Sequence, residues 1–442
     1  MAQQIPRTRT LSIDERTVDE PPAGKPKVEE DNGLVKPPTG FEGDFPDGGL
    51  RAWLVVGGTM CTTFSTFGYV NAWGVFQAYY EETLLKDSDS SKIAWIGSVQ
   101  YALIFMPGLI TGRMFDIGYF KLPFFLASIL LVVATFLVAQ CTQYWHFLLC
   151  QGFAIGLACG TIFGPAMGII GHWFRRRRGL ALGIMATGSS IGGTVIPITA
   201  RKLINAVGFP WTMRIIAFIL MFTLGIANLT LKRRLPPVNV SGGILNLKAF
   251  KSAPYTIWCI ANFIAFLGLY TVLTYISVSA AAYGVSADIS FYMVSIANAS
   301  SGIGRIVAGI FIDRIGAVNY FGPMTIIAAA LTYAWPFARS LASMIVVAVI
   351  YGFSSGAYVS SFLTPIFELG EIGDLGRRTG MAMSIVALGA LAGPPISGAI
   401  NTATGGFEAV GYYAGKSSTI MLAVVLMYVV RHLVLGTLRG KF

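Results

Sequence analysis

The chain has 442 residues, of which 54% are hydrophobic and 12% charged, and it carries a formal net charge of +11. This composition is typical of integral membrane proteins and excludes an ordinary soluble domain. The basic residues lie between apolar stretches, as they do at the cytoplasmic ends of membrane helices. The positive charge therefore does not indicate nucleic-acid binding.

Cysteine and histidine give no sign of a metal site. No two of the five cysteines have the C-x-x-C spacing, and the three histidines lack the cysteine or carboxylate neighbours of a ligand set. We therefore expect no metal, no cofactor and no enzymatic activity. The residues concerned are Cys61, Cys141, Cys150, Cys159, Cys259, His146, His172 and His432.

Residues 1–50 are polar, contain seven prolines and show almost no apolar periodicity, which predicts a disordered cytoplasmic tail. From Trp53 onward, apolar stretches of about 20 residues alternate with short polar loops, and each is long enough to cross a bilayer. The sequence therefore predicts an all-α membrane protein with twelve transmembrane helices. The expected helices are 53–79, 93–112, 122–140, 146–170, 178–200, 212–231, 255–280, 290–311, 319–337, 342–366, 379–400 and 417–436.

Basic residues are concentrated in alternate loops, for example at 175–178, 232–234 and 377–378. The other loops hold fewer basic residues, and in the first of them acidic residues offset the positive charge. This asymmetry predicts that both termini are cytoplasmic. We expect the plasma membrane, with the vacuolar membrane as the alternative.

The chain also repeats itself. Residues 178–188 align with 379–389, and the loop 112–118 resembles the loop 309–316, so that Asp116 corresponds to Asp313. This pattern predicts two six-helix halves, with a binding site between them at mid-membrane and a rocking transport mechanism. The expected boundaries are 51–235 for the first half, 236–253 for a cytoplasmic linker and 254–442 for the second half.

Arg305 lies in the middle of the apolar stretch 291–316. An arginine at the centre of a membrane helix costs roughly 2.5–3.5 kcal/mol, so such a residue normally faces the protein interior or a watery cavity. Asn298 and Ser301 precede it at helical spacing and share its face. The arginine either forms a permanent ion pair inside the bundle or binds an anionic substrate. We favour the substrate because no carboxylate partner is evident within the membrane.

Other polar or aromatic residues at membrane depth could complete such a site, although each could equally be an ordinary helix contact. Together they predict an aromatic, weakly polar cavity with one cation, which suits an organic anion with an apolar body. The candidates beside Arg305, Asn298 and Ser301 are Asn71, Tyr69, Tyr270 and Tyr358.

Glycines recur at helical spacing and indicate close helix packing, which we expect at the interface of the two halves. They are Gly179, Gly183, Gly188, Gly192, Gly389 and Gly393. Asp116 and Asp313 end helices on the predicted cytoplasmic side. Each could bind backbone N–H groups of the next helix and pair with an arginine, Arg113 or Arg314, and so hold one conformation closed. The alternative is that both loops are simple turns.

Two motifs resemble signatures of the monocarboxylate porter family within the major facilitator superfamily. Residues 47–53 (DGGLRAW) are similar to its D-G-G-x-x-W entry to helix one, and residues 173–183 (WFRRRRGLALG) to its second signature at the start of helix five. The stretches 74–80, 266–270 and 389–395 are similar to the fungal branch. The resemblance covers nearly everything from Asp47 onward and implies the major facilitator fold, with twelve helices in two six-helix pseudo-repeats.

By this resemblance Arg305 matches the helix-eight arginine that binds the substrate carboxylate. Two positions depart from the members that cotransport lactate and a proton. Ser301 stands where they have an aspartate, and Asn71 where they have a lysine. Proton coupling is therefore left open. The cargo is also open, because fungal relatives include carriers of riboflavin and of metabolites from biosynthetic clusters.

The sequence thus predicts a secondary active or facilitative transporter of a small organic anion or monocarboxylate-type metabolite, working by alternating access. Its partners would be a carboxylate-bearing small molecule and the lipid bilayer. The first alternative is an efflux carrier for a fungal secondary metabolite, in which Arg305 is structural. A more distant alternative is a membrane sensor that does not transport. Substrate identity, direction and oligomeric state are not predicted.

Overall fold

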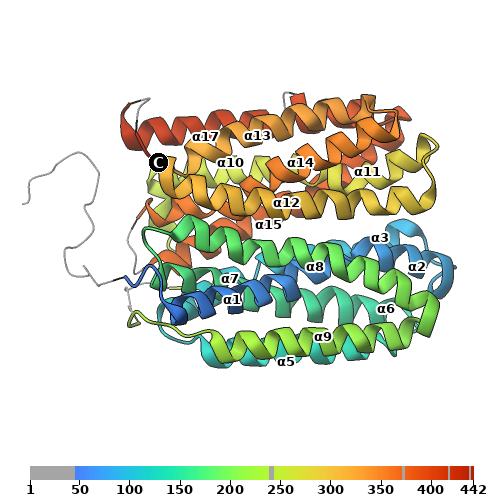
Figure 1. Ribbon diagram of the computed structural model, residues 1–442, viewed down its shortest axis with the longest axis horizontal. Coiled ribbons are helices and arrows are strands. Elements are labelled where there is room, and N and C mark those ends of the chain that lie inside the picture. Colours follow the sequence, from blue (N-terminus) through green and yellow to red (C-terminus); the bar gives the residue numbers. More distant parts are fainter. Residues whose placement is uncertain (1–44, 238–242, 371–373, 417–418, 438–439) are drawn as a thin grey trace, which may run out of the picture. The chain divides into compact units, whose positions relative to one another are not determined.

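The computed structural model describes residues 45–237, 243–370, 374–416, 419–437 and 440–442, all within one compact unit. Over these ranges the chain is helical and forms no strand. Most of the predicted tail, residues 1–44, and residues 238–242 of the predicted linker lie outside them. Figure 1 shows the helices up to α9 gathered in one group and those from α10 onward in another.

The first group consists of six helical segments, three of which are interrupted by a π-helix or a turn. They are α1 (Leu50–Thr63) with the π-helical Phe64–Gly68, α2 (Trp73–Tyr79) and π-helical Tyr80–Leu84; α3 (Ser90–Phe105) with α4 (Gly108–Asp116); α5 (Lys121–Val138); α6 (Tyr144–Phe147) with the π-helical Leu148–Ile155 and α7 (Gly156–Trp173); α8 (Arg178–Val207); and α9 (Phe209–Thr230).

The second group follows a 3-10 helix, Leu247–Lys251, in the predicted linker, and also forms six segments. They are α10 (Ala253–Leu269) with α11 (Thr271–Ala282); α12 (Ala287–Ile315); α13 (Ala317–Ala334) with the 3-10 helix Trp335–Phe337; α14 (Leu341–Ser361) with the 3-10 helix Thr364–Phe367; α15 (Leu375–Thr404); and α16 (Glu408–Gly411) with the π-helical Tyr412–Lys416 and α17 (Ile420–Leu435).

Each of the twelve predicted membrane helices coincides with one of these segments, which agrees with the predicted fold class. Among the described residues, ten segments are long and apolar enough to cross a membrane. The other two are the first segment, which a turn at Asn71–Ala72 interrupts, and α13. Some helices are longer than predicted, since α8 continues to Val207 and α12 begins at Ala287.

The connection between α8 and α9 is a single residue, Gly208, and Gly316 alone connects α12 to α13 in the same way. Their φ angles are +78° and +97°. Residues with a side chain rarely adopt such backbone conformations, whereas glycine adopts them without steric penalty. Glycine at these two positions therefore allows each long helix to turn directly into its neighbour.

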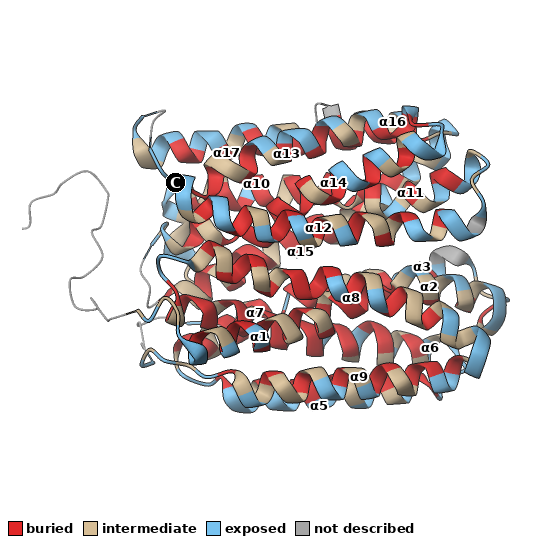
Figure 2. Ribbon diagram, in the orientation of Figure 1, coloured by how far each residue is buried: buried red, intermediate tan, exposed pale blue. Residues whose placement is uncertain are grey.

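Two helix pairs join the halves. The first half contributes α8, which packs along α12 of the second half, and α4 with α3, which pack along α15. We call these contacts the α8–α12 seam and the α4–α15 seam. Figure 2 shows buried residues concentrated where the helices face one another. Outward faces carry exposed apolar side chains, such as Phe222 and Leu229 on α9, as expected for a surface against lipid.

Candidate functional site

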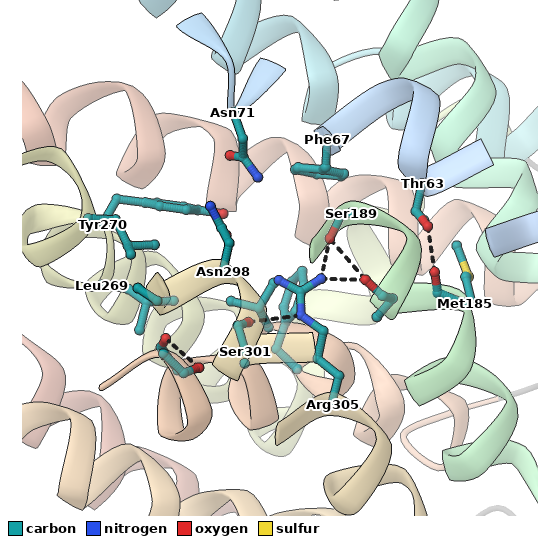
Figure 3. Close-up of a pocket in the computed structure, with 18 of the residues that line it drawn as sticks. Thr63, Phe67, Asn71, Met185, Ser189, Leu269, Tyr270, Asn298, Ser301 and Arg305 are labelled. Carbon is teal, nitrogen blue, oxygen red and sulfur yellow. Dashed lines mark hydrogen bonds between the residues drawn. The ribbon is translucent and has the colours of Figure 1, made fainter. Parts of the chain in front are cut away.

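A cavity lies between the halves, and its lining comes from both of them (Figure 3). Of the described residues that line it, Arg305 alone is charged. The other polar members are neutral and come from helices on both sides. They are Thr63, Asn71, Ser189, Tyr270, Asn298, Ser301 and Ser355.

Arg305 is 8% exposed and uses part of its guanidinium group within the protein. Its Nε donates to Ser301 Oγ at 3.2 Å, and its Nη1 donates to the Ala186 carbonyl oxygen at 2.6 Å and to Ser189 Oγ. Among the described residues no carboxylate forms an ion pair with Arg305, and its other terminal nitrogen, Nη2, makes no hydrogen bond. One donor nitrogen of the guanidinium, Nη2, is thus left for a further acceptor.

Two helix breaks also border the cavity. The first segment breaks at Asn71, between its π-helix and α2, and Tyr270 separates α10 from α11 at the corresponding place in the second half. Asn71 Oδ1 accepts a hydrogen bond from the Tyr101 hydroxyl at 2.8 Å. Interrupted helices near the midplane often line the binding sites of transporters, because their backbone and side chains can face a cavity.

Aromatic rings make up much of the remaining lining. Phe67 contacts Phe105 and Phe163, with ring centroids 5.4 and 4.7 Å apart. Phe105 of α3 meets Phe266 of α10 across the two halves, at 5.8 Å. Tyr101 and Tyr270 also face each other across the halves, at 6.0 Å. The cavity therefore combines one cation, several neutral hydrogen-bonding groups and aromatic walls.

Five of the seven residues predicted to bind substrate line this cavity: Asn71, Tyr270, Asn298, Ser301 and Arg305. The structure does not bring the other two there. Tyr69 is buried against Phe76 in the first half, and the Tyr358 hydroxyl donates to Asn262 Oδ1 at 2.6 Å inside the second half. Both lie at membrane depth but on helix faces that turn away from the cavity, and depth alone does not determine the face.

Several lining residues were not predicted, including Ser189 and the aromatic residues Phe67, Phe105 and Phe266. A usable signal existed for α8. Gly179 and Gly183 mark its face toward the second half, and steps of three or four residues along that face lead to Ala186, Ser189 or Ser190, and Gly193. No comparable pattern marks the aromatic residues, since phenylalanine is frequent throughout the apolar stretches.

The two predicted gating aspartates bind helix N-termini. The sequence suggested the N-terminus of the next helix, but each aspartate binds a helix of the opposite half. Asp116 accepts the backbone N–H groups of Gly376 and Arg377 at 3.0 and 2.9 Å, at the start of α15. Asp313 accepts those of Gly179 and Leu180 at 2.7 and 2.9 Å, at the start of α8. Each aspartate therefore ties its own half to the opposite half, where an N-terminal helix dipole favours a carboxylate.

The two arginines expected beside these aspartates differ from each other, since Arg113 interacts electrostatically with the Asp116 carboxylate. Arg314 is exposed and forms no ion pair among the described residues. Arg113 lies near the end of α4, less than one turn before Asp116. Among the described residues, backbone N–H groups of the opposite helix donate hydrogen bonds to both carboxylates. We call the end of the bundle that holds Asp116 and Asp313 the aspartate end.

The packing glycines divide into two groups. Gly179 and Gly183 lie at the α8–α12 seam, where a Cβ added at Gly183 would be 2.5 Å from the Arg305 carbonyl oxygen. The prediction that all six lie between the halves is wrong for the others. Gly188 and Gly192 pack against the first helical segment, and Gly389 and Gly393 pack against α10, each within its own half. Close spacing in sequence indicated close packing but not the partner helix.

The two signature motifs meet at the aspartate end. Asp47 Oδ1 accepts the N–H groups of Arg175 and Arg176 at 2.7 and 2.8 Å, and the rings of Trp53 and Phe174 lie 5.2 Å apart. The segment before α1 therefore fixes the loop that leads into α8. This places the α8 N-terminus where Asp313 can bind it.

Residues 59–369 and 258–436 match the family model described as Major Facilitator Superfamily. The chain belongs to the major facilitator superfamily. Members of this superfamily are transporters rather than enzymes, so the protein is a multi-pass integral membrane transporter. Among its described residues, no group of three or more His, Cys, Asp or Glu could hold a metal ion.

Fungal transporters are among the curated relatives of this major facilitator protein. It is 40% identical to the MFS transporter asaE of Aspergillus flavus, over 82% of each chain. It is 36% identical to the aspyridones efflux protein apdF of Emericella nidulans, over 90% of this chain and 81% of that one. It is also 34% identical to the agnestins efflux protein AgnL12 of Paecilomyces divaricatus, over 79% and 81%. These names support the superfamily but not the narrower monocarboxylate porter family.

Solved structures show the same fold at low sequence identity. The human organic anion transporter MFSD10 is 16% identical, with a TM-score of 0.67 over 86% of this chain and all of that one. The transporter FucP, captured in its outward conformation, is also 16% identical, with a TM-score of 0.65 over 87% of this chain and 99% of its own. These two comparisons bear on the fold alone.

Proposed function

We propose that this transporter exports a small organic metabolite of fungal secondary metabolism by alternating access, with the cargo bound in the cavity around Arg305. Two relatives at 36% and 34% identity are named as efflux proteins for aspyridones and agnestins. Export therefore replaces the monocarboxylate carrier predicted from sequence as the leading proposal. The direction of transport rests on these relatives, whereas the binding site rests on the structure.

The main support for the proposed site is that the Arg305 guanidinium is buried and forms no ion pair with a carboxylate among the described residues. A buried guanidinium without a carboxylate partner is strongly disfavoured unless acceptors satisfy it, and here the unused Nη2 borders the cavity. The fitting cargo has an oxygen acceptor, anionic or strongly polar, next to an apolar ring system that packs on Phe67, Phe105 and Phe266. Carboxylate, enolate and phenolate groups all meet this description.

The proposal includes an orientation and a membrane. The aspartate end is cytoplasmic, as the basic loops at 175–178 and 377–378 favour, and the exporter resides in the plasma membrane. The hydrogen bonds of Asp116 and Asp313 then hold the cytoplasmic side closed, and they must break before cargo enters. Among the described lining residues there is no carboxylate or histidine, so a proton moved with the cargo would have to bind elsewhere.

The test compares metabolites inside and outside cells of the source organism with and without the gene. We expect at least one compound to accumulate in the cells and to fall in the medium on deletion, and a restored wild-type gene to reverse both changes. An unchanged ratio of cell to medium concentration for every detected compound would contradict export. If deletion instead abolished uptake of an added carboxylate, the organic-anion importer predicted from the sequence would replace the exporter.

A further inference from the structure

The hydrogen bonds of Arg305 do not stay within its own half. Arg305 belongs to α12, whereas Ala186 and Ser189 belong to α8, so both acceptors of Nη1 lie across the α8–α12 seam. Figure 3 shows the Arg305 guanidinium reaching toward Ser189 beside the cavity. The residue predicted to bind cargo is thus also a direct link between the halves.

Ser189 is oriented for this contact. Its hydroxyl donates to the Ala186 carbonyl oxygen at 2.9 Å, which leaves its lone pairs available to accept from Arg305 Nη1. The Ala186 carbonyl accepts from both groups. Ser301 holds Nε from the opposite side, within α12. The guanidinium is therefore fixed through Nε and Nη1, which lie on either side of Nη2, and Nη2 is the donor still available.

A cargo oxygen that binds Nη2 lies next to Nη1 as well, because the two terminal nitrogens of a planar guanidinium form one fork. A bidentate acceptor would compete with the Ala186 carbonyl and the Ser189 hydroxyl for Nη1. We propose that Arg305, positioned by Ser189, is a latch between the halves; this proposal rests on the export function proposed above. Cargo opens the latch by replacing the Ala186 carbonyl and the Ser189 hydroxyl as the hydrogen-bond acceptor of Nη1. Cargo binding then weakens the seam that must separate during transport.

The rest of the seam makes such a latch effective. Next to the latch, α8 and α12 touch through small-residue packing, with Gly183 against Gly309 and Ser190 against Gly302. Directional bonds cross the seam at its two ends, where Asp313 binds the start of α8 and Arg201 pairs with Asp288 at 2.7 Å. Asn298 Nδ2 adds a longer hydrogen bond of 3.3 Å to the Gly193 carbonyl oxygen. Packing contacts of this kind hold two surfaces together without directional bonds. The charge-assisted bonds of Arg305 are the strongest polar contacts at this depth of the seam.

The latch can be tested in the full-length protein without any ligand, in lipid nanodiscs, by distance measurements between pairs of spin labels. The five native cysteines are first replaced by alanine. One pair of labels at Arg176→Cys and Arg314→Cys reports on the aspartate end of the seam. A second pair at Lys202→Cys and Ile289→Cys reports on its other end. All four positions are exposed, so the labels do not disturb the core.

Ser189→Ala removes one of the two acceptors across the seam. We expect the wild type to be mainly joined, and the variant to raise the ratio of separated to joined molecules at least about fivefold at one end, since a charge-assisted hydrogen bond stabilises the joined state. Arg305→Gln, which loses both bonds, should raise that ratio further. Ser189→Thr keeps the hydroxyl and should retain the wild-type distances.

Ser190→Ala is the matched control, because Ser190 lies at the same seam and its buried hydroxyl makes no hydrogen bond. It should leave the distances unchanged. Equal separation in Ser190→Ala and Ser189→Ala would show that packing, not the latch, holds the seam, and would overturn the proposal. Unchanged distances in both Ser189→Ala and Arg305→Gln, or a wild type already separated, would also overturn it. These measurements use no cargo, so their result is independent of the export test. They can contradict the latch while metabolite export is confirmed, or support the latch while export is not confirmed.

Discussion

The two seams between the halves are alike at the aspartate end and differ at mid-depth. In each, an aspartate binds two N–H groups at the start of a long helix of the opposite half, and glycines allow the backbones to touch. Eight residues before Asp116, α4 has Gly108, whose carbonyl oxygen lies 2.1 Å from where a Cβ on Gly380 would be. Eight residues before Asp313, α12 has Arg305.

This difference shows how a repeated structure acquires a single site. Both halves keep the geometry that lets them meet and separate, with an aspartate and a glycine at matching positions. At one position of the repeat, a glycine closes the α4–α15 seam directly, whereas an arginine places a charge beside the cavity at the α8–α12 seam. Under the proposed export function, the common features serve the movement of the halves and Arg305 serves cargo binding. The predictions below test first what the seams share and then what distinguishes the cavity.

Gly112→Val should have the largest effect, because a Cβ at this position would lie 2.1 Å from the Gly376 carbonyl oxygen and force α4 away from α15. We expect the free energy of unfolding to fall by about 1–3 kcal/mol, as in other overpacked contacts. We also expect export to fall more than about tenfold, because the Asp116 bonds to α15 depend on the same approach. Gly57→Val is the control, since no atom lies within 4 Å of its added Cβ. Equal stability of the two variants would show that the seam is not tightly packed.

Asp116→Asn and Asp313→Asn test the part that the seams share. Each removes a negative charge and one acceptor from a helix N-terminus, and we expect each to lower export by roughly three- to tenfold. The two effects should be of similar size because the contacts are equivalent. Asp288→Asn is the control on α12. The Asp288 side chain is 83% exposed, so its ion pair with Arg201 should contribute little to the stability of the closed state. A large effect of only one of the two substitutions would mean that one seam alone controls the closed state.

Tyr101→Phe should have the smallest effect, because it removes only a neutral hydrogen bond to Asn71, which lines the cavity. We expect the apparent KM for the exported compound to rise about two- to tenfold with little change in expression. Tyr69→Phe is the control, since Tyr69 is buried within the first half and does not line the cavity. If Tyr69→Phe changed the KM as much as Tyr101→Phe, the cavity would be wrongly assigned.

The fold could be predicted from sequence because its signals are local and repeated. Apolar stretches of membrane length gave the twelve segments, and the matching loops of Asp116 and Asp313 gave the two halves. Contacts between distant residues gave no such signal. Asp116 binds residues about 260 positions later in the chain, and Arg305 binds a backbone carbonyl, which every residue has. Tyr69 follows a π-helical stretch, Phe64–Gly68, that composition does not indicate, and the direction of Tyr358 on α14 depends on its contact with Asn262, 96 residues earlier in the chain.

Arg305→Gln in the source organism tests the central claim most directly, with export measured for the compound that accumulates in the deletion strain. Arg314→Gln is the matched control, because it makes the same change at an exposed position on the same helix. We expect Arg305→Gln to reduce export by at least about tenfold, since a charged hydrogen bond to cargo is lost, while the protein remains in the membrane and Arg314→Gln exports normally. Export by Arg305→Gln equal to that of Arg314→Gln would contradict the assignment of Arg305 to the cargo site.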